Sequence, residues 1–417
     1  MLCLNLIFMR KEVMTMGKGI QLMGILVLIL GFIVSPGFTA EPLKIATLTD
    51  MSGPYAELAG WGNINAAKMA IEDFGGKVLG MNIEYVYRDH QCKADLANQK
   101  AIELYEKEKA DVIFDCPNSA SGLAVTNQAL KYKKIFIAIT SGTTRYTGDL
   151  CNRYTFHWAY NDYVLATSAG IWAADNLGKR WYTITADYAW GHDLLKHFSA
   201  ALQKRGGTLL GNEMVPLGAS DFSPFIIKAM NAKPEVLALL NAGKDTVNST
   251  KQAVEFGLRK TTKIVHALLF PEDIKAAGPE VFADNYVTAS WDWTVDQPGV
   301  KEFVAKWMKK FGRPPNWFNA GNYSCVTQYL LAVKRAGSKD PQAVIKALEG
   351  YRFNDFFANP GYIRPEDHKR VGKAFILRAK KPSEIKEPWD YFQIVGVVPA
   401  DQAYQDVKET GCKMGGF

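Results

Sequence analysis

The residues of this chain best suited to chemistry are hydrogen-bond donors that follow short apolar runs. Ser141-Gly142-Thr143-Thr144 follows the apolar run 135–139 and offers hydroxyl groups and unpaired backbone N–H groups. Such donors at the end of a strand can bind an anionic group of a small ligand. The competing interpretation is a polar turn that only starts a helix. Asn118 and Ser119 follow the apolar run 112–114 and are expected to face the same crevice.

The segment 43–74 repeats this organisation. Residues 43–48 predict a buried strand, residues 50–56, which include Ser52, predict a turn, and residues 61–73 predict a helix with one apolar face. A helix N-terminus at the end of a strand carries the positive end of the helix dipole and favours a carboxylate there. The alternative is an ordinary opening β-α unit without a ligand.

Aromatic residues occur in or near the loops that should border such a crevice. They are Tyr55, Trp61, Tyr160, Phe270, Trp291 and Trp293. Each one taken singly is better explained by packing in a core. The group as a whole favours a pocket that stacks an aromatic or bulky apolar solute.

Apolar runs of strand length alternate with helical periodicities, which predicts an α/β fold with mostly parallel sheets and helices on both faces. The pattern restarts near Tyr154, so two α/β halves are expected, with a ligand in the crevice at the carboxyl ends of both sheets. Strands are expected at 43–48, 82–87, 112–114, 135–139, 181–185, 208–215 and 236–240. Helices are expected at 61–73, 95–107, 121–131, 162–176, 222–232, about 245–257 and 322–336, and one more helix follows the strand 181–185 and ends at about 204.

The first 40 residues predict a secretory signal peptide. Lys18 precedes the apolar run 20–34, and small residues lead to Ala40, where cleavage is expected. Cleavage lowers the formal charge from +7 to about +5, because the basic residues before the cut outnumber the single acidic one by two. The remaining charge is spread along the chain without a polybasic run, which argues against nucleic-acid binding. The mature chain is therefore expected to be an exported, soluble protein.

Several short motifs resemble, in the same order, those of the branched-chain amino-acid binding protein family. This family comprises type I periplasmic receptors of ABC importers. No single motif is specific, but their order over more than 200 residues is. The matching segments are Leu43 to Ala56, Asp89-His90-Gln91-Cys92, Phe114-Asp115-Cys116, Ile139 to Thr144, Asp187-Tyr188-Ala189-Trp190-Gly191, Asp221-Phe222 and Glu255-Phe256-Gly257-Leu258.

The resemblance implies two lobes that are joined by three crossings and close on a solute like a hinged clamp. The first lobe is expected to hold residues 41–158 and about 295–350. The second is expected to hold 159–294 and about 351–400, with a C-terminal tail at 401–417. The closed form would be recognised by the membrane permease.

The resemblance also assigns roles to single residues. The positions of Gly142 and Thr144 bind the ligand carboxylate in the family. Trp190 stands where the family often has a Tyr that covers the ligand, and its larger indole favours flat or apolar solutes. Pro117 replaces a Ser and has no N–H, which weakens the case for an ordinary amino acid. Asp245 falls where amino-acid binders place a carboxylate for the ligand's ammonium group; the competing interpretation is a helix N-cap.

Five cysteines remain after cleavage, and export to an oxidising compartment favours disulfides. Compartment and resemblance together imply a bond between Cys92 and Cys116. Cys151 and Cys412 are a possible second pair if the tail returns to the hinge. Cys325 lies in an apolar helical segment and is expected to be a buried thiol.

These observations predict a monomeric periplasmic receptor for a small carboxylate-bearing solute, without a cofactor or metal. Its partners would be the solute and an ABC-importer permease. A receptor for branched-chain or aromatic amino acids is one alternative, and a sensory or regulatory protein of the same fold is another. An enzyme is not expected, because the six histidines lack metal-ligand spacing and no nucleophile elbow, P-loop or G-x-G-x-x-G motif occurs.

Overall fold

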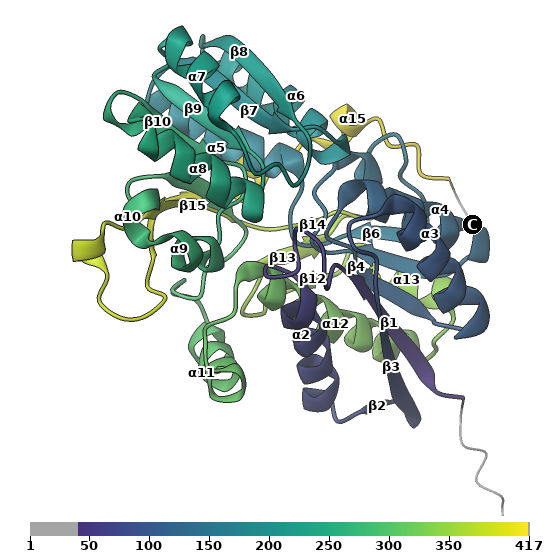
Figure 1. The fold of residues 1–417 in the computed structure, drawn as a ribbon. Coiled ribbons are helices and arrows are strands. Elements are labelled where there is room, and N and C mark those ends of the chain that lie inside the picture. Colours follow the sequence, from purple (N-terminus) through teal and green to yellow (C-terminus); the bar gives the residue numbers. More distant parts are fainter. Residues whose placement is uncertain (1–40, 416–417) are drawn as a thin grey trace, which may run out of the picture. The chain divides into compact units, whose positions relative to one another are not determined.

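The computed structural model describes residues 41–415. The predicted signal peptide and the last two residues lie outside the described residues. Two large sheets organise the chain (Figure 1).

The first sheet has six strands in the order β2-β3-β1-β4-β5-β6. All neighbours pair in parallel except β2, which forms an antiparallel hairpin with β3. Every residue of β4 and β5 is buried, as expected for parallel strands that are covered on both faces. The strands are β1 (Leu43–Thr49), β2 (Lys77–Val78), β3 (Met81–Asp89), β4 (Val112–Asp115), β5 (Ile135–Ala138) and β6 (Thr155–His157).

Helices surround this sheet, and α12 packs against α2. Two ion pairs join α11 to α2, one between Lys306 and Asp73 and one between Lys310 and Glu72. The helices are α2 (Gly60–Asp73), α3 (Ala94–Ile102, continued by a π-helical turn at Glu103–Lys107), α4 (Ser119–Tyr132), α11 (Val300–Phe311), α12 (Trp317–Ala336) and α13 (Pro341–Leu348).

The second sheet has seven strands in the order β16-β15-β11-β10-β9-β7-β8. The five strands from β7 to β11 are parallel to one another, while β15 pairs antiparallel with both β11 and β16. The strands are β7 (Arg180–Ala186), β8 (Thr208–Val215), β9 (Val236–Leu240), β10 (Lys263–His266), β11 (Tyr286–Ala289), β15 (Ala374–Ala379) and β16 (Phe392–Val398). The helices that follow or precede them are α5 (Asp162–Asn176), α6 (Ala189–Lys204), α7 (Ser223–Ala232), α8 (Lys244–Glu255), α9 (Pro271–Ala277) and α10 (Pro279–Phe282).

Smaller elements complete the described chain. A three-stranded sheet has the order β12-β13-β14, and two short helices follow the last strand of the second sheet. They are β12 (Arg352–Phe353), β13 (Gly361–Ile363), β14 (Arg370–Val371), α14 (Ala400–Ala403) and α15 (Val407–Thr410), with 3₁₀ turns at Thr144–Thr147, Leu258–Lys260 and Pro382–Glu384. Within the described range, no helix is both long enough and apolar enough to cross a membrane.

The link from the first sheet to the second, residues 157–160, is held by two buried basic side chains. Lys369 Nζ lies 2.9 Å from the carbonyl oxygen of Tyr160 and 3.3 Å from that of Trp158. Arg370 donates to the carbonyls of Trp158 and Ala159 at 2.9 and 2.6 Å. The two side chains thus supply donors to buried backbone carbonyls of the crossing, and Ser290 Oγ adds a further donor to the carbonyl of Ala159 at 2.7 Å.

The cysteines confirm one predicted disulfide and contradict the other. Cys151 and Cys412 are bonded across 261 residues, so the tail does return to the segment before the crossing. Cys92 and Cys116 are free, which shows that the bond expected between them is wrong for this structure. The Cys92 thiol instead donates a hydrogen bond to the Asp50 carboxylate at 2.9 Å. Cys325 is a buried free thiol, as predicted.

Candidate functional site

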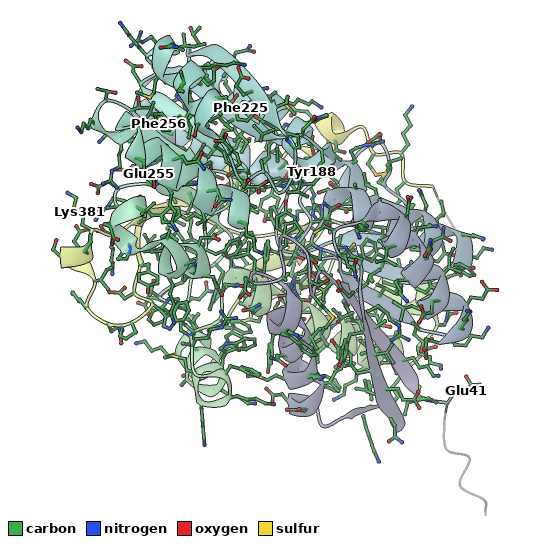
Figure 2. All side chains as sticks on the ribbon, viewed as in Figure 1. Glu41, Tyr188, Phe225, Glu255, Phe256 and Lys381 are labelled. Atoms are coloured by element: carbon green, nitrogen blue, oxygen red, sulfur yellow. A yellow bond between two sulfur atoms is a disulfide. The ribbon has the colours of Figure 1, made fainter. Side chains whose placement is uncertain are left out.

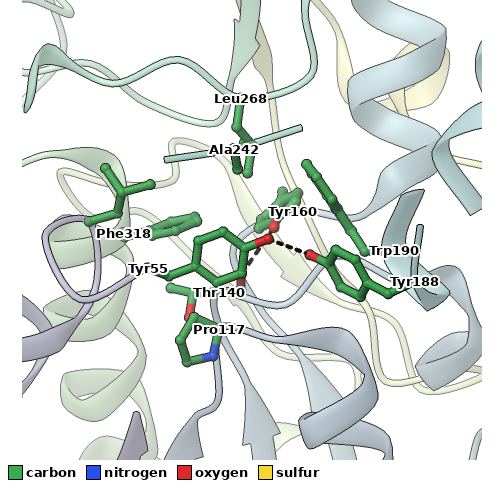
Figure 3. Close-up of a pocket in the computed structure, with 10 residues that line it drawn as sticks. Tyr55, Pro117, Thr140, Tyr160, Tyr188, Trp190, Ala242, Leu268 and Phe318 are labelled. Atoms are coloured by element: carbon green, nitrogen blue, oxygen red, sulfur yellow. Dashed lines mark hydrogen bonds between the residues drawn. The ribbon is translucent and has the colours of Figure 1, made fainter. Parts of the chain in front are cut away.

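A small cavity lies where loops of the two sheets meet (Figure 3). Its lining comes from the ends of β1, β4 and β5, from the crossing, from the start of α6, from the loops after β9 and β10, and from α12. The lining residues are Tyr55, Leu58, Pro117, Thr140, Tyr160, Tyr188, Trp190, Ala242, Leu268 and Phe318. About 10 Å³ of space remains between them, roughly enough for one water molecule.

Aromatic rings form most of the wall. The hydroxyl groups of Tyr55 and Tyr188 hydrogen-bond each other at 2.7 Å, and Tyr160 donates to the carbonyl of Thr140 at 3.0 Å (Figure 3). Burial raises the pKa of all three tyrosines well above its ordinary value, so these hydroxyls are neutral. Figure 2 shows Tyr188 near the middle of the molecule, whereas Phe225 and Phe256 lie toward the outer end of the second-sheet layer.

Gly142 lies at the back of this wall for a steric reason. A Cβ atom at this position would collide with the side chains of Asp162, Tyr160 and Trp190. Only glycine therefore lets these three groups converge. The Trp190 indole N–H and both Asp162 carboxyl oxygens are buried and make no close hydrogen bond to the described residues, but Trp190 and Asp193 both lie near enough to Asp162 to shift its pKa through side-chain hydrogen bonding. Burial first, and then the nearby charge of Asp193, raise the pKa of Asp162 well above its ordinary value.

The predicted anion-binding loop is occupied by a side chain of the protein. Asp193 of α6 accepts hydrogen bonds from the Thr144 backbone N–H at 2.5 Å, from Thr144 Oγ1 at 2.8 Å and from Thr143 Oγ1 at 3.1 Å. His197 Nε2 lies 3.2 Å from the same carboxylate. Burial alone would raise the pKa of Asp193, but His197 and the Thr144 donors outweigh it and hold this pKa well below its ordinary value.

The other predicted polar residues of this region also bind within the protein. Asn118 is the N-cap of α4 and accepts from the Ser121 N–H at 2.9 Å. Ser119 Oγ accepts from the Thr143 N–H at 3.2 Å, and Ser141 Oγ lies 2.9 Å from the hydroxyl of Tyr146. The structure thus gathers these residues behind the cavity wall, where they order the loop.

Asp245 does not cap its helix, so that interpretation is wrong. The N-cap of α8 is Gly243, and no side chain caps the helix. Asp245 Oδ2 instead accepts from the Gly218 N–H at 3.0 Å, while Oδ1 is buried with no partner among the described residues. Burial raises the pKa of Asp245 to about 6. Its charge also acts on Tyr55, which places it near the cavity although it does not line it.

Several residues predicted to border the ligand do not line this cavity. Ser52 is exposed and donates to Asp89 at 2.6 Å. Trp61 is 52% exposed on α2 and packs edge-on against Tyr87. Trp291 is buried and donates to the Phe356 carbonyl at 2.9 Å. Two further predicted residues behave as packing groups. Phe270 stacks on Trp317 behind the lining, and Trp293 borders a separate surface pocket.

The sequence analysis did not predict some lining residues, including Tyr188 and Phe318, or the carboxyl groups of Asp162 and Asp193 behind the cavity wall. Tyr188 lies within a quoted motif, and its position two residues before Trp190 was the available signal. Asp193 and His197 are one helical turn apart, which only indicates a common face. Phe318 lies far along the chain, and nothing local shows that α12 returns to the cavity. No cluster of three or more His, Cys, Asp or Glu side chains suited to a metal ion occurs in residues 41–415.

Comparisons with known proteins agree with this architecture. The sequence model of the family described as "Periplasmic binding protein" matches residues 42–384. A periplasmic binding protein from Burkholderia mallei is 41% identical, with a TM-score of 0.86, and the match covers 89% of this chain and 98% of that one. The type I fold predicted from the motif order is thereby confirmed.

Two more distant relatives carry ligand names. A solute-binding protein of an ABC transporter from Rhodopseudomonas palustris, solved with 3,4-dihydroxybenzoic acid, is 26% identical with a TM-score of 0.77, and the match covers 86% of this chain and 98% of that one. A protein named Leu/Ile/Val-binding protein homolog 4 from Brucella abortus is 24% identical over 242 residues. That alignment spans 54% of this chain and just over half, 56%, of the relative.

Proposed function

Because this chain belongs to the periplasmic binding protein family, a family of solute-binding receptors, we propose that it is the periplasmic solute receptor of an ABC importer. The proposed solute is small, with an aromatic or bulky apolar body and a carboxylate or similar acceptor group. The observation that carries this proposal is the small cavity walled by Tyr55, Tyr160, Tyr188, Trp190 and Phe318. Flat rings on several sides favour a flat apolar body.

The polar groups of the wall suit an acceptor on the solute. Trp190 Nε1 is a buried donor that makes no close hydrogen bond but faces the Asp162 carboxyl. Tyr55 and Tyr188 share one hydrogen bond, which leaves a second hydroxyl hydrogen to donate. The distant relative solved with 3,4-dihydroxybenzoic acid supports an aromatic acid as the class of solute.

The small size of the cavity supports a hinged closure. A solute ring cannot enter about 10 Å³ of space, so the lining must part before binding and close afterwards. We propose that the two sheet layers, with boundaries near 158 and 295 and again near 350, are the lobes that move. The closed form would present the permease with its docking surface, and the receptor would act as a monomer after removal of its signal peptide.

A receptor for branched-chain or aromatic amino acids is the second candidate. Its support is Asp245, whose buried Oδ1 has no partner among the described residues and whose charge reaches Tyr55. A solute ammonium group would pair with this oxygen. The name of the Brucella relative points the same way. We propose no catalytic role for the cavity, and a sensory role would share the same binding step.

Thermal unfolding of the ligand-stripped protein against a solute panel tests the proposal. The panel pairs each aromatic acid with its α-amino counterpart and adds leucine, valine, urea and short amides. A solute at 100 times its dissociation constant adds about 2.7 kcal/mol of stability. Aromatic acids without an amino group are expected to raise the melting temperature. Shifts with amino acids alone would favour the second candidate, and turnover of a bound solute would restore an enzymatic function.

A further inference from the structure

The loop Ser141–Thr144 and Asp193 raise a question about where a solute carboxylate can bind. Residue types and family resemblance assign this loop to the solute. In the structure, the donors of Thr143 and Thr144 are directed to Asp193 instead. Asp193 thus holds the position that the solute's acid group was expected to take.

The contact is between the two sheet layers and is largely hidden from solvent. The loop follows β5 of the first sheet, and Asp193 lies in the first two turns of α6, which packs beside the second sheet. The side chains of Asp193 and His197 are 10% and 9% exposed. The Asp193 carboxylate is surrounded by the hydroxyls of Thr143 and Thr144, the Thr144 N–H and the His197 imidazole. These contacts leave no donor of Thr143 or Thr144 for a second carboxylate.

A second carboxylate would also meet unfavourable charge. Like charges at contact distance disfavour each other strongly in a buried site. Asp162 lies beside Gly142 and close to Asp193, and its raised pKa keeps it neutral. A solute acid placed on this loop would therefore face the charged carboxylate of Asp193.

We propose that Asp193 is a specificity-determining residue: its carboxylate occupies the anion position of the 141–144 loop, so that the solute's acceptor group is received by the Tyr55–Tyr188 hydroxyl pair. This inference rests on the proposed function, because it concerns the same cavity. It disfavours α-amino acids, which need a carboxylate site beside an ammonium site, and favours acids that bind through neutral donors.

The occupancy of the loop is tested with formate, a carboxylate small enough to replace the Asp193 side chain. Melting temperatures of wild type, Asp193→Ala and the control Asp175→Ala are measured in increasing sodium formate at constant ionic strength. Asp175 is an exposed acidic residue of α5 that pairs with Arg205. Formate is expected to stabilise only Asp193→Ala. Stabilisation of wild type, or no response of Asp193→Ala, would overturn the assignment.

A second variant keeps the test decisive if Asp193→Ala does not fold. Thr144→Val removes one hydroxyl donor and keeps the side-chain shape. Its effect on benzoate and benzamide affinity is compared with that of Tyr188→Phe, by calorimetric titration. Thr144→Val is expected to weaken both solutes by the same factor, and Tyr188→Phe to weaken benzoate more than benzamide. A selective loss of benzoate in Thr144→Val would place the solute acid on the loop and overturn the inference.

The two failures are distinguishable. If wild type binds neither benzoate nor any other aromatic acid, the proposed function fails, while the formate titration still decides whether Asp193 fills the loop. If aromatic acids bind but Thr144→Val loses benzoate selectively, the proposed function stands and only the role of Asp193 is wrong.

Discussion

At the scale of single residues, the cavity combines neutral donors with buried carboxyl groups that are kept out of it. Asp245 is the carboxyl group that distinguishes the two candidate functions, because only an amino-acid solute would pair an ammonium group with it. Its buried Oδ1 has no partner among the described residues, and burial raises its pKa from 3.8 to about 6. A solute ammonium would lower that pKa again by pairing with the charged form. The pKa of Asp245 is therefore expected to differ between the solute-free protein and a complex with an amino acid.

Asp245→Asn should change how stability depends on pH. Between about pH 4 and 6 the folded protein holds a proton on Asp245 that the unfolded chain has lost, so this group makes stability fall as pH rises. In wild type this costs about 1 to 3 kcal/mol at neutral pH relative to acid pH. Urea unfolding of both proteins at acid and neutral pH measures it. Parallel pH profiles would contradict the raised pKa.

Gly142→Ala tests the steric role of glycine in the wall. The added methyl group would collide with Tyr160, Trp190 and Asp162. Forced rearrangement in a packed region costs about 1 to 3 kcal/mol, and solute affinity should fall at least about tenfold, which is about 1.4 kcal/mol of binding free energy. The matched control is Gly415→Ala, where a Cβ meets open space. Equal affinities of wild type and Gly142→Ala would show that the wall tolerates the change.

The sequence predicted the loop residues but not their partners. Ser141 to Thr144 stands after a strand, and that position is a local property of the chain. The partner Asp193 lies 49 residues further on, and only the packing of α6 brings it to the loop. The predicted bond between Cys92 and Cys116 is wrong for the same reason. Whether Cys92 contacts Cys116 or the Asp50 carboxylate depends on side-chain direction, which the sequence does not show.

At the scale of elements, alternating apolar runs were enough to predict most strands and helices before residue 260. Parallel strands buried on both faces are continuous apolar runs, and β4 and β5 have that form. β6, with three residues, is too short to give such a signal. The aromatic residues Trp61 and Trp291 show the limit of the method, since a ring in or near a loop can face solvent, a core or a ligand.

The disulfide between Cys151 and Cys412 fixes the C-terminal segment to the region before the crossing. Closing 261 residues of chain restricts the unfolded state, and such bonds contribute about 2 to 4 kcal/mol. Cys412→Ser should lower the free energy of unfolding by that amount. Lys413→Ser, at an exposed neighbour, serves as the control. Equal stabilities of wild type and Cys412→Ser under oxidising conditions would refute the contribution.

At the scale of the whole molecule, loops of the two sheet layers meet at the cavity, and we propose that the layers enclose a solute there. Lys369 and Arg370 hold the crossing at 157–160, and Asp193 joins the layers beside the cavity. The family and the fold could be predicted because the motifs occur in the same order as in the family, although no single motif is specific. The solute was not, because its class depends on which donors remain free after Asp193 has taken the loop.

The most direct test is a crystal structure of the complex with the solute that gives the largest thermal shift. We predict an aromatic body between Tyr55, Tyr160 and Trp190, with its acceptor group on the Tyr55–Tyr188 hydroxyl pair and the Asp193 carboxylate still bound to Thr144. A solute carboxylate seated on Thr143 and Thr144 with Asp193 displaced, or an ammonium group on Asp245, would contradict it.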